Sequence, residues 1–126
     1  MRLEFSPEWK RRVFQDMYLS TGPMGTDKHL RLYRGILEHA IRDYAKLRDV
    51  AREDRASYSR DVLRDFLDAR AWIFRKTPPH AWVDRVNSFV SVCLLLGVLP
   101  ADVRRLAEEI TQEELRLWSR KKTEVA

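Results

Sequence analysis

Two adjacent arginines late in the chain, Arg104 and Arg105, have the chemistry to recognise another molecule. A guanidinium group binds guanine through two hydrogen bonds, clamps a phosphate or pairs with a carboxylate. Val103 and Leu106 flank the pair at the spacing of one buried helix face. The opposite face is expected to be exposed and to carry Ala101, Arg104, Arg105 and Glu108. These four residues are the first candidate contact surface, for DNA or for a protein partner.

A second group of cations stands near the end of the sequence, close to Trp118. Arg120, Lys121 and Lys122 form the basic end of the last predicted helix. Cations beside an aromatic ring can track a nucleic-acid backbone. Cations at a helix C-terminus also favour the helix dipole. Both interpretations stay open at this stage, and the three residues join the candidate contact surface.

Residues suited to catalysis or metal binding are scattered. His29, His39 and His80 share no helical face at a ligand spacing, and Cys93 lies in an apolar stripe. Adjacent glutamates near the C-terminus point to different sides of a helix, whereas acid–base catalysis needs convergent carboxylates. We therefore expect no metal site, no cofactor and no enzymatic activity.

The arginine pair belongs to a segment, about 88–110, with the pattern of a helix-turn-helix. Ser88 is a suitable N-cap for the first helix. Gly97 can adopt the positive φ that relaxes the turn, and Pro100 suits the first turn of the second helix. The small residue Cys93 stands four positions before the glycine. The spacing matches the motif, although a glycine turn between short helices also occurs in ordinary helical cores.

Two features of this segment count against strong DNA binding. Leu99 and Pro100 occupy the entry to the second helix, where polar groups often meet DNA. Carboxylates also gather nearby and repel phosphate. They are Asp102, Glu108, Glu109, Glu113 and Glu114.

The rest of the chain reads as helices that position this segment. Ser6-Pro7-Glu8 starts an N-terminal helix over 6–19. A long helical hairpin is expected over 27–75, with Ser57 or Ser59 capping its second arm. A short helical segment over 81–86, which contains Trp82, follows Pro78 and Pro79 at the end of this hairpin. Thr111-Gln112-Glu113-Glu114 is a capping box that opens a last helix over 111–122.

Composition sets the class of protein. The 126 residues are rich in helix formers and carry a net charge of +5, which permits nucleic acid without requiring it. A single cysteine suits a reducing compartment, and no N-terminal signal or apolar run of about 20 residues is visible. We expect a cytoplasmic, all-α protein without membrane contact, folded as a single compact bundle of about six or seven helices over 1–126.

A resemblance follows from the order of several motifs. The tryptophan-containing stretch Ala69–Phe74 precedes Ser88–Val98 and Pro100–Arg105, and Ile36–Tyr44 lies upstream. This order resembles a group of small, mostly uncharacterised bacterial and phage-associated proteins over roughly residues 30–110. Leu99 stands where an acidic or small polar cap is usual in that group. The resemblance implies a helix-turn-helix regulator.

Two functions are therefore expected. The first is a DNA-binding helix-turn-helix transcriptional regulator of phage-like origin, which contacts double-stranded DNA. The alternative is a non-enzymatic protein-binding helical module, an accessory or inhibitory factor that docks on host machinery. The polarity of the presented helix is mixed and does not choose between them.

Overall fold

The computed structural model describes residues 7–19, 28–75 and 87–125, with side chains from Pro7 to Tyr18 and onward through the two later ranges as far as Trp118. These ranges hold seven helices and no strand, which confirms the all-α class. None of these helices is long and apolar enough to cross a membrane. The helices are α1 (Glu8–Leu19), α2 (Lys28–Arg48), α3 (Arg52–Arg55), α4 (Arg60–Ile73), α6 (Phe89–Leu95), α7 (Pro100–Glu109) and α8 (Gln112–Val125).

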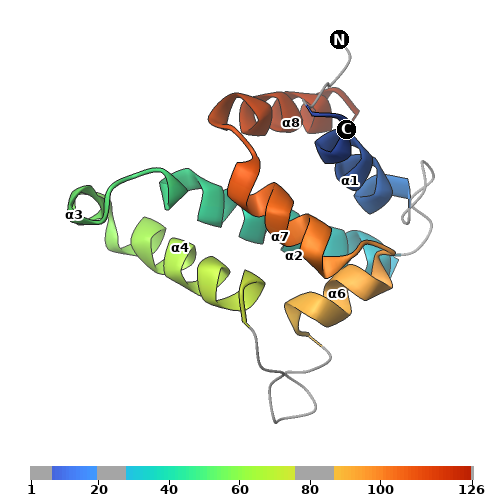
Figure 1. Cartoon of the computed structure of the whole chain (residues 1–126), viewed down its shortest axis with the longest axis horizontal. Coiled ribbons are helices and arrows are strands. Elements are labelled where there is room, and N and C mark those ends of the chain that lie inside the picture. The colour runs from blue at the N-terminus through green and yellow to red at the C-terminus, as the bar shows by residue number, and fades with distance from the viewer. Residues whose placement is uncertain (1–6, 20–27, 76–86, 126) are drawn as a thin grey trace.

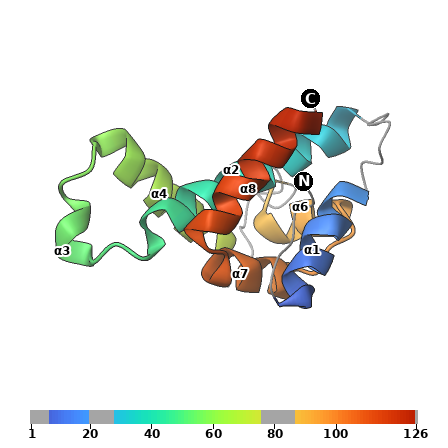
Figure 2. The same ribbon diagram turned by 90° about the horizontal axis from the view of Figure 1, so that it is seen from above.

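The long helix α2 is the centre of the molecule. It packs along α4 and also contacts α6, α7 and α8 (Figure 1). The short helix α3 lies in the connection between α2 and α4, at the end farthest from α1 and α6 (Figure 2). Helix α7 touches α1, α2 and α6, so it is enclosed on several sides. The predicted short segment over 81–86, with Trp82, lies outside the described residues.

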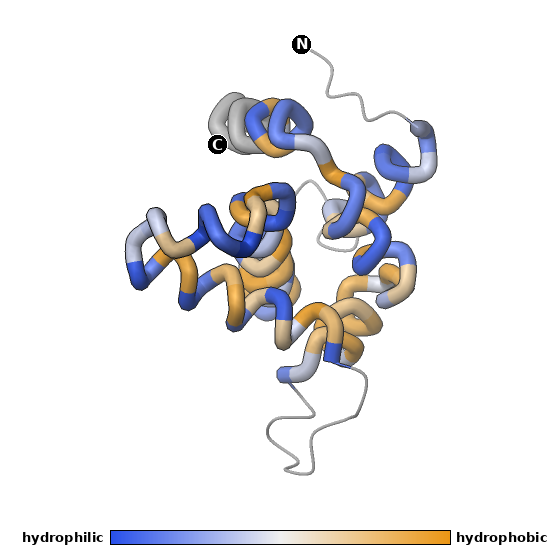
Figure 3. The backbone as a smooth tube through the Cα atoms, turned by 60° about the vertical axis from the view of Figure 1, so that its left-hand side comes forward, coloured by the Kyte–Doolittle hydropathy of each residue, from blue (hydrophilic) through white to orange (hydrophobic). Residues whose placement is uncertain are grey.

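One hydrophobic core joins these helices. Leu37, Ile41 and Ala45 of α2 are fully buried. They belong to the same cluster as Leu106 of α7 and Trp118 of α8. The spacing of three and four residues along α2 explains this arrangement, because it turns one face of the helix continuously inward. Hydrophobic residues also gather along α6 and the helices packed against it (Figure 3).

Polar side chains start the later helices as the sequence predicts. Ser59 Oγ accepts a hydrogen bond from Val62 N at 3.3 Å, and Ser88 Oγ accepts one from Ser91 N at 3.2 Å. The capping box before α8 is also confirmed. Thr111 N donates to Glu114 Oε1 at 2.9 Å, and Glu114 N donates to Thr111 Oγ1 at 3.0 Å. These bonds satisfy backbone N–H groups that a helix leaves without partners.

Two cations, the half-buried Arg48 and the buried Lys10, hold the C-terminal end of α7. Arg48 donates to the carbonyl oxygens of Ala107 at 2.7 Å and Ile110 at 2.6 Å. The Nζ of Lys10 donates to Glu109 O at 2.7 Å and pairs with Glu114 at 3.1 Å. The last carbonyls of a helix lack intrahelical donors and carry partial negative charge. Part of the basic composition therefore serves the fold.

A partly buried chain of hydrogen bonds connects α8, α1 and α2. The indole Nε1 of Trp118 donates to Tyr18 Oη at 2.7 Å, and Tyr18 Oη donates to Glu38 Oε1. Burial, and then the hydrogen bond to Glu38, raises the pKa of Tyr18 above its usual value. Arg34 lies over the Tyr18 ring at 4.6 Å. The chain fixes the rotation of α1 and α8 on α2, because each donor must meet its acceptor.

Candidate functional site

The turn between α6 and α7 has the geometry that the sequence predicts at Gly97. Its φ is +75°, the one positive φ among the described residues. Gly97 N donates to Leu94 O at 3.1 Å, and Val98 N donates to Cys93 O at 2.9 Å. This pair of bonds is a Schellman motif, in which glycine ends the helix in the left-handed conformation. The prediction of a glycine turn is confirmed.

The second helix of the pair starts without a polar cap. Leu99 is the N-cap of α7 and makes no side-chain capping bond, and Pro100 follows in the first turn. Leu99 is also 63% exposed. An apolar side chain at this entry has no hydrogen bond to give to a phosphate or a base edge.

The structure places Arg104 away from the exposed face, and the prediction that it points outward is wrong. Its Nε donates to Ile73 O at 2.8 Å, and a terminal nitrogen donates to Arg75 O at 3.2 Å. The guanidinium also lies over the Phe89 ring at 5.0 Å. Helix α4 ends beside α7, and its last carbonyls need donors. Arg104 supplies them, so its charge is committed to the fold.

Arg105 is exposed as predicted, but it has partners within the protein. Its side chain pairs with Glu109 at 2.9 Å and lies over the Trp9 ring at 4.0 Å. The contact with Trp9 joins α7 to α1. Ala101 and Glu108 are also exposed, in agreement with the prediction. With Asp102 and Glu109 exposed too, the outer face of α7 carries three carboxylates to one guanidinium.

The remaining predicted residues do not come together with this face. The backbone of Arg120, Lys121 and Lys122 lies in α8, and their side chains lie outside the described residues. His29 and His39 are exposed on α2. The described part of the chain contains no group of three histidine, cysteine, aspartate or glutamate residues that could hold a metal ion.

Cys93 lies in the hydrophobic core between α6 and the rest of the bundle. It is fully buried, and burial raises the pKa of its thiol to about 12. The thiolate is the nucleophilic form of cysteine, and this environment suppresses it. Cys93 is therefore a small core residue.

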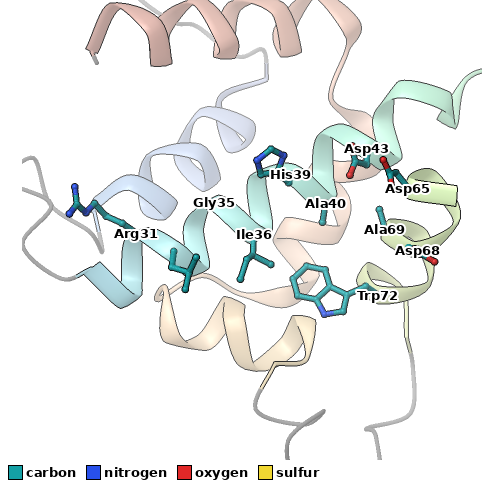
Figure 4. A pocket seen from close by; sticks show the side chains of 11 residues that line it. Arg31, Gly35, Ile36, His39, Ala40, Asp43, Asp65, Asp68, Ala69 and Trp72 are labelled. Carbon is teal, nitrogen blue, oxygen red and sulfur yellow. The ribbon is translucent and has the colours of Figure 1, made fainter. Parts of the chain in front are cut away.

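A groove between α2 and α4 is an open feature that the sequence did not predict. It has a volume of about 740 Å³. Ile36 of α2 and Trp72 of α4 supply large apolar side chains to it (Figure 4). Leu32 of α2 also lines it. Leu32 is 61% exposed and Ile36 is 42% exposed. Gly35, Ala40 and Ala69 are the small residues that line the same space.

Trp72 is held in place at the edge of this groove. Its Nε1 donates to Asn87 O at 3.0 Å, and its ring packs edge-to-face on Phe89 at 5.4 Å. A half-buried indole with both its polar atom and one ring edge occupied keeps a fixed orientation. Its free surface is thus available to the groove without rearrangement.

Charge is distributed unevenly along the groove. Arg31 lies at one end, and Asp43, Asp65 and Asp68 lie at the other (Figure 4). Burial, and then the nearby charge of Asp65, raises the pKa of Asp43 above its usual value. None of the three carboxylates forms a hydrogen bond or an ion pair with a described residue. The nearby charges of Lys46 and His39 act in the opposite direction on the pKa of Asp43, but three carboxylates gather here, and this end of the groove is an acidic patch.

The sequence holds a weak signal for this groove. Ile36 belongs to the apolar stripe of α2, and the stripe is wider than the surface that α4 and α6 cover. Gly35 stands inside the same helix with no turn to explain it. Which part of a wide stripe stays exposed depends on the crossing of the neighbouring helices, and the spacing of residues alone does not give that crossing.

Comparison with known proteins assigns the chain to no family. No protein-family model matches the chain, and neither a curated protein nor a solved structure shows significant similarity to it. The resemblance to small bacterial and phage-associated proteins therefore stays a prediction. Function has to be argued from the surfaces themselves.

Proposed function

We propose that this protein is a non-enzymatic helical module that binds another protein through the groove between α2 and α4. The observation that carries the proposal is the exposure of Leu32 and Ile36 beside the fixed ring of Trp72. Apolar side chains grouped in a hollow and rimmed by charges are typical of interaction sites. Aromatic anchors such as Trp72 contribute strongly to binding when a partner covers them.

Binding, as distinct from catalysis, is supported by the chemistry of the same surface. The groove offers apolar contact and fixed charges, which provide affinity and orientation. The thiol of Cys93, the one cysteine of the chain, is protonated and enclosed in the core. The proposal gives the protein the role of an accessory or inhibitory factor, which acts by occupying its partner.

A peptide-display selection tests this proposal. The full-length protein is the bait, and a library of helical peptides is the prey. The selected peptides should lose at least tenfold in affinity for Leu32→Glu and keep their affinity for Leu99→Glu. The two leucines are matched, because they are 61% and 63% exposed and only Leu32 lines the groove. Selected peptides that bind both variants equally would place the interaction elsewhere and refute the proposal.

DNA binding by α6 and α7 is the second candidate function. The Schellman turn at Gly97 favours it, because the turn of a helix-turn-helix often contains a glycine. A gel-shift titration at two salt concentrations tests it with Arg105→Ala, which removes the one exposed guanidinium of the α7 face. Specific binding requires a shift that weakens with salt and with the substitution. A wild-type protein that shifts no duplex at low salt would eliminate this candidate.

A further inference from the structure

We infer that the groove binds an amphipathic helix that runs antiparallel to α2, with lysine or arginine in its N-terminal turn beside Asp43, Asp65 and Asp68. This inference rests on the proposed function and specifies the partner at the same site. Three independent features of the groove support it: its shape, an unexplained glycine and its charge distribution.

The shape of the groove suits a third helix. Its two walls are helices, α2 and α4, which pack along each other. Small side chains, those of Ala40 and Ala69, line the space between the larger anchors. Arg31 and Asp43 mark its ends and are twelve residues apart on α2, which corresponds to about 18 Å at the helical rise. A helix of about three turns spans that length and presents anchors at positions i, i+3 or i+4, and i+7.

Gly35 has no role in the isolated fold that explains its presence. It lies inside α2 with ordinary helical φ, and a Cβ built on it meets nothing within 4 Å. Glycine inside a helix is less favourable than alanine, because it loses more conformational freedom on folding. Glycine thus destabilises α2 at this position, and no other side chain of the described residues occupies the space beside it. Close approach by another backbone or a bulky side chain is what such a space accommodates.

The charges give the bound helix a direction. The acidic patch of Asp43, Asp65 and Asp68 attracts the positive end of a helix dipole and basic side chains near it. Arg31, at the other end, attracts the negative C-terminal end of the same helix. Because Arg31 is near the start of α2 and Asp43 is near its end, the partner runs antiparallel to α2. A cation beside Asp43 would also relieve the repulsion from Asp65 that contributes to its raised pKa.

Two designed peptides test the direction. Each has about 18 residues, blocked ends, leucines at helical anchor spacing and a hydrocarbon staple on the opposite face, so that both are helical before binding. The first carries lysines in its first turn and glutamates in its last, and the second carries the reverse. Fluorescence anisotropy with the full chain should show at least tenfold tighter binding of the lysine-first peptide. The dipole of that peptide itself disfavours this order, so the preference has to come from the protein.

Three variants locate the effect. Asp68→Lys should reduce the preference below about threefold, because a lysine at this position repels the lysines of the first peptide and attracts the glutamates of the second. Asp16→Lys is the matched control, since Asp16 is an exposed aspartate inside α1 and outside the groove, and it should leave the preference unchanged. Gly35→Leu fills the open space and should weaken both peptides at least tenfold. Circular dichroism checks its folding, and Leu32→Glu replaces it if the fold is lost.

The outcomes separate this inference from the proposed function. Equal or reversed affinity of the two peptides, together with loss of both on Gly35→Leu, overturns the direction and leaves the groove as a binding site. An equal effect of Asp16→Lys and Asp68→Lys reduces the preference to net charge and also overturns the direction. Binding that survives both Gly35→Leu and Leu32→Glu overturns the groove itself, and with it the proposed function.

Discussion

Gly97→Ala is expected to destabilise the protein, whereas Gly35→Ala is expected to stabilise it. At both positions a new Cβ meets nothing within 4 Å, so a steric clash contributes to neither change. The two sites differ in backbone conformation: Gly97 has φ +75°, and Gly35 is helical. The comparison therefore isolates the cost of the left-handed conformation.

The magnitudes follow from this difference. A left-handed conformation costs a non-glycine residue about 1–2 kcal/mol. Alanine also restricts the unfolded chain more than glycine does, and this offsets about 0.4–1 kcal/mol of that cost. Gly97→Ala should thus lower the free energy of unfolding by about 0.5–1.5 kcal/mol. Gly35→Ala should raise it by about 1 kcal/mol through helix propensity.

Urea and thermal denaturation followed by far-ultraviolet circular dichroism measure both variants beside the wild type. For a chain of this length, 1 kcal/mol corresponds to a change in Tm of about 4 °C. The two midpoints should move in opposite directions with unchanged slopes in urea. Shifts of the same sign would refute the assignment of the turn to Gly97, because the two positions would then respond only to the added methyl group.

Three further predictions use the same denaturation assays. Arg104→Ala should lower the free energy of unfolding by about 1–3 kcal/mol, because it leaves the carbonyl of Ile73 without its charged donor. Arg105→Ala should lower it by less than about 1 kcal/mol, because its ion pair with Glu109 is exposed. Equal costs would contradict the assigned roles. Thr111→Ala should cost about 1 kcal/mol through the lost cap. Glu114→Ala should cost about 3 kcal/mol or more, because it also leaves the buried charge of Lys10 without its counter-charge. Similar costs would show that the ion pair contributes little. Burial raises the pKa of Cys93 to about 12 from 9.0, so above about pH 9 the native state keeps a proton that the unfolded state loses. The free energy of unfolding should therefore fall from about pH 9 upward by as much as about 1.4 kcal/mol per pH unit. A Cys93→Ala variant with the same pH dependence would contradict this origin.

Several basic side chains stabilise helix ends, whereas the net charge by itself suggests a surface for nucleic acid. Lys10, Arg48 and Arg104 donate to main-chain carbonyls at or just beyond the C-terminal ends of α4 and α7. Arginine suits this task because its planar group reaches two acceptors at once. A net charge of +5 is therefore a weak indication of nucleic-acid binding in this protein. What matters for a partner is the charge left exposed on each surface.

Local rules explain the part of the fold that the sequence predicted. The caps at Ser59, Ser88 and Thr111 and the turn at Gly97 depend on residues within five positions of one another. The apolar spacing of α2 likewise fixes which of its sides turns inward. These interactions form within a single helix or turn, so the order of residues specifies them.

The sequence by itself determined that the chain is helical, where several of its helices begin and which residue makes the turn before α7. Only the tertiary structure decided that Arg104 turns to the end of α4, and that Leu32, Ile36 and Trp72 stay open in a groove. The physical reason is that both outcomes depend on where one helix crosses another. A helix offers the same stripe and the same flanking cations to any neighbour. The crossing then selects which carbonyls lie within reach of an arginine and which part of the stripe stays uncovered.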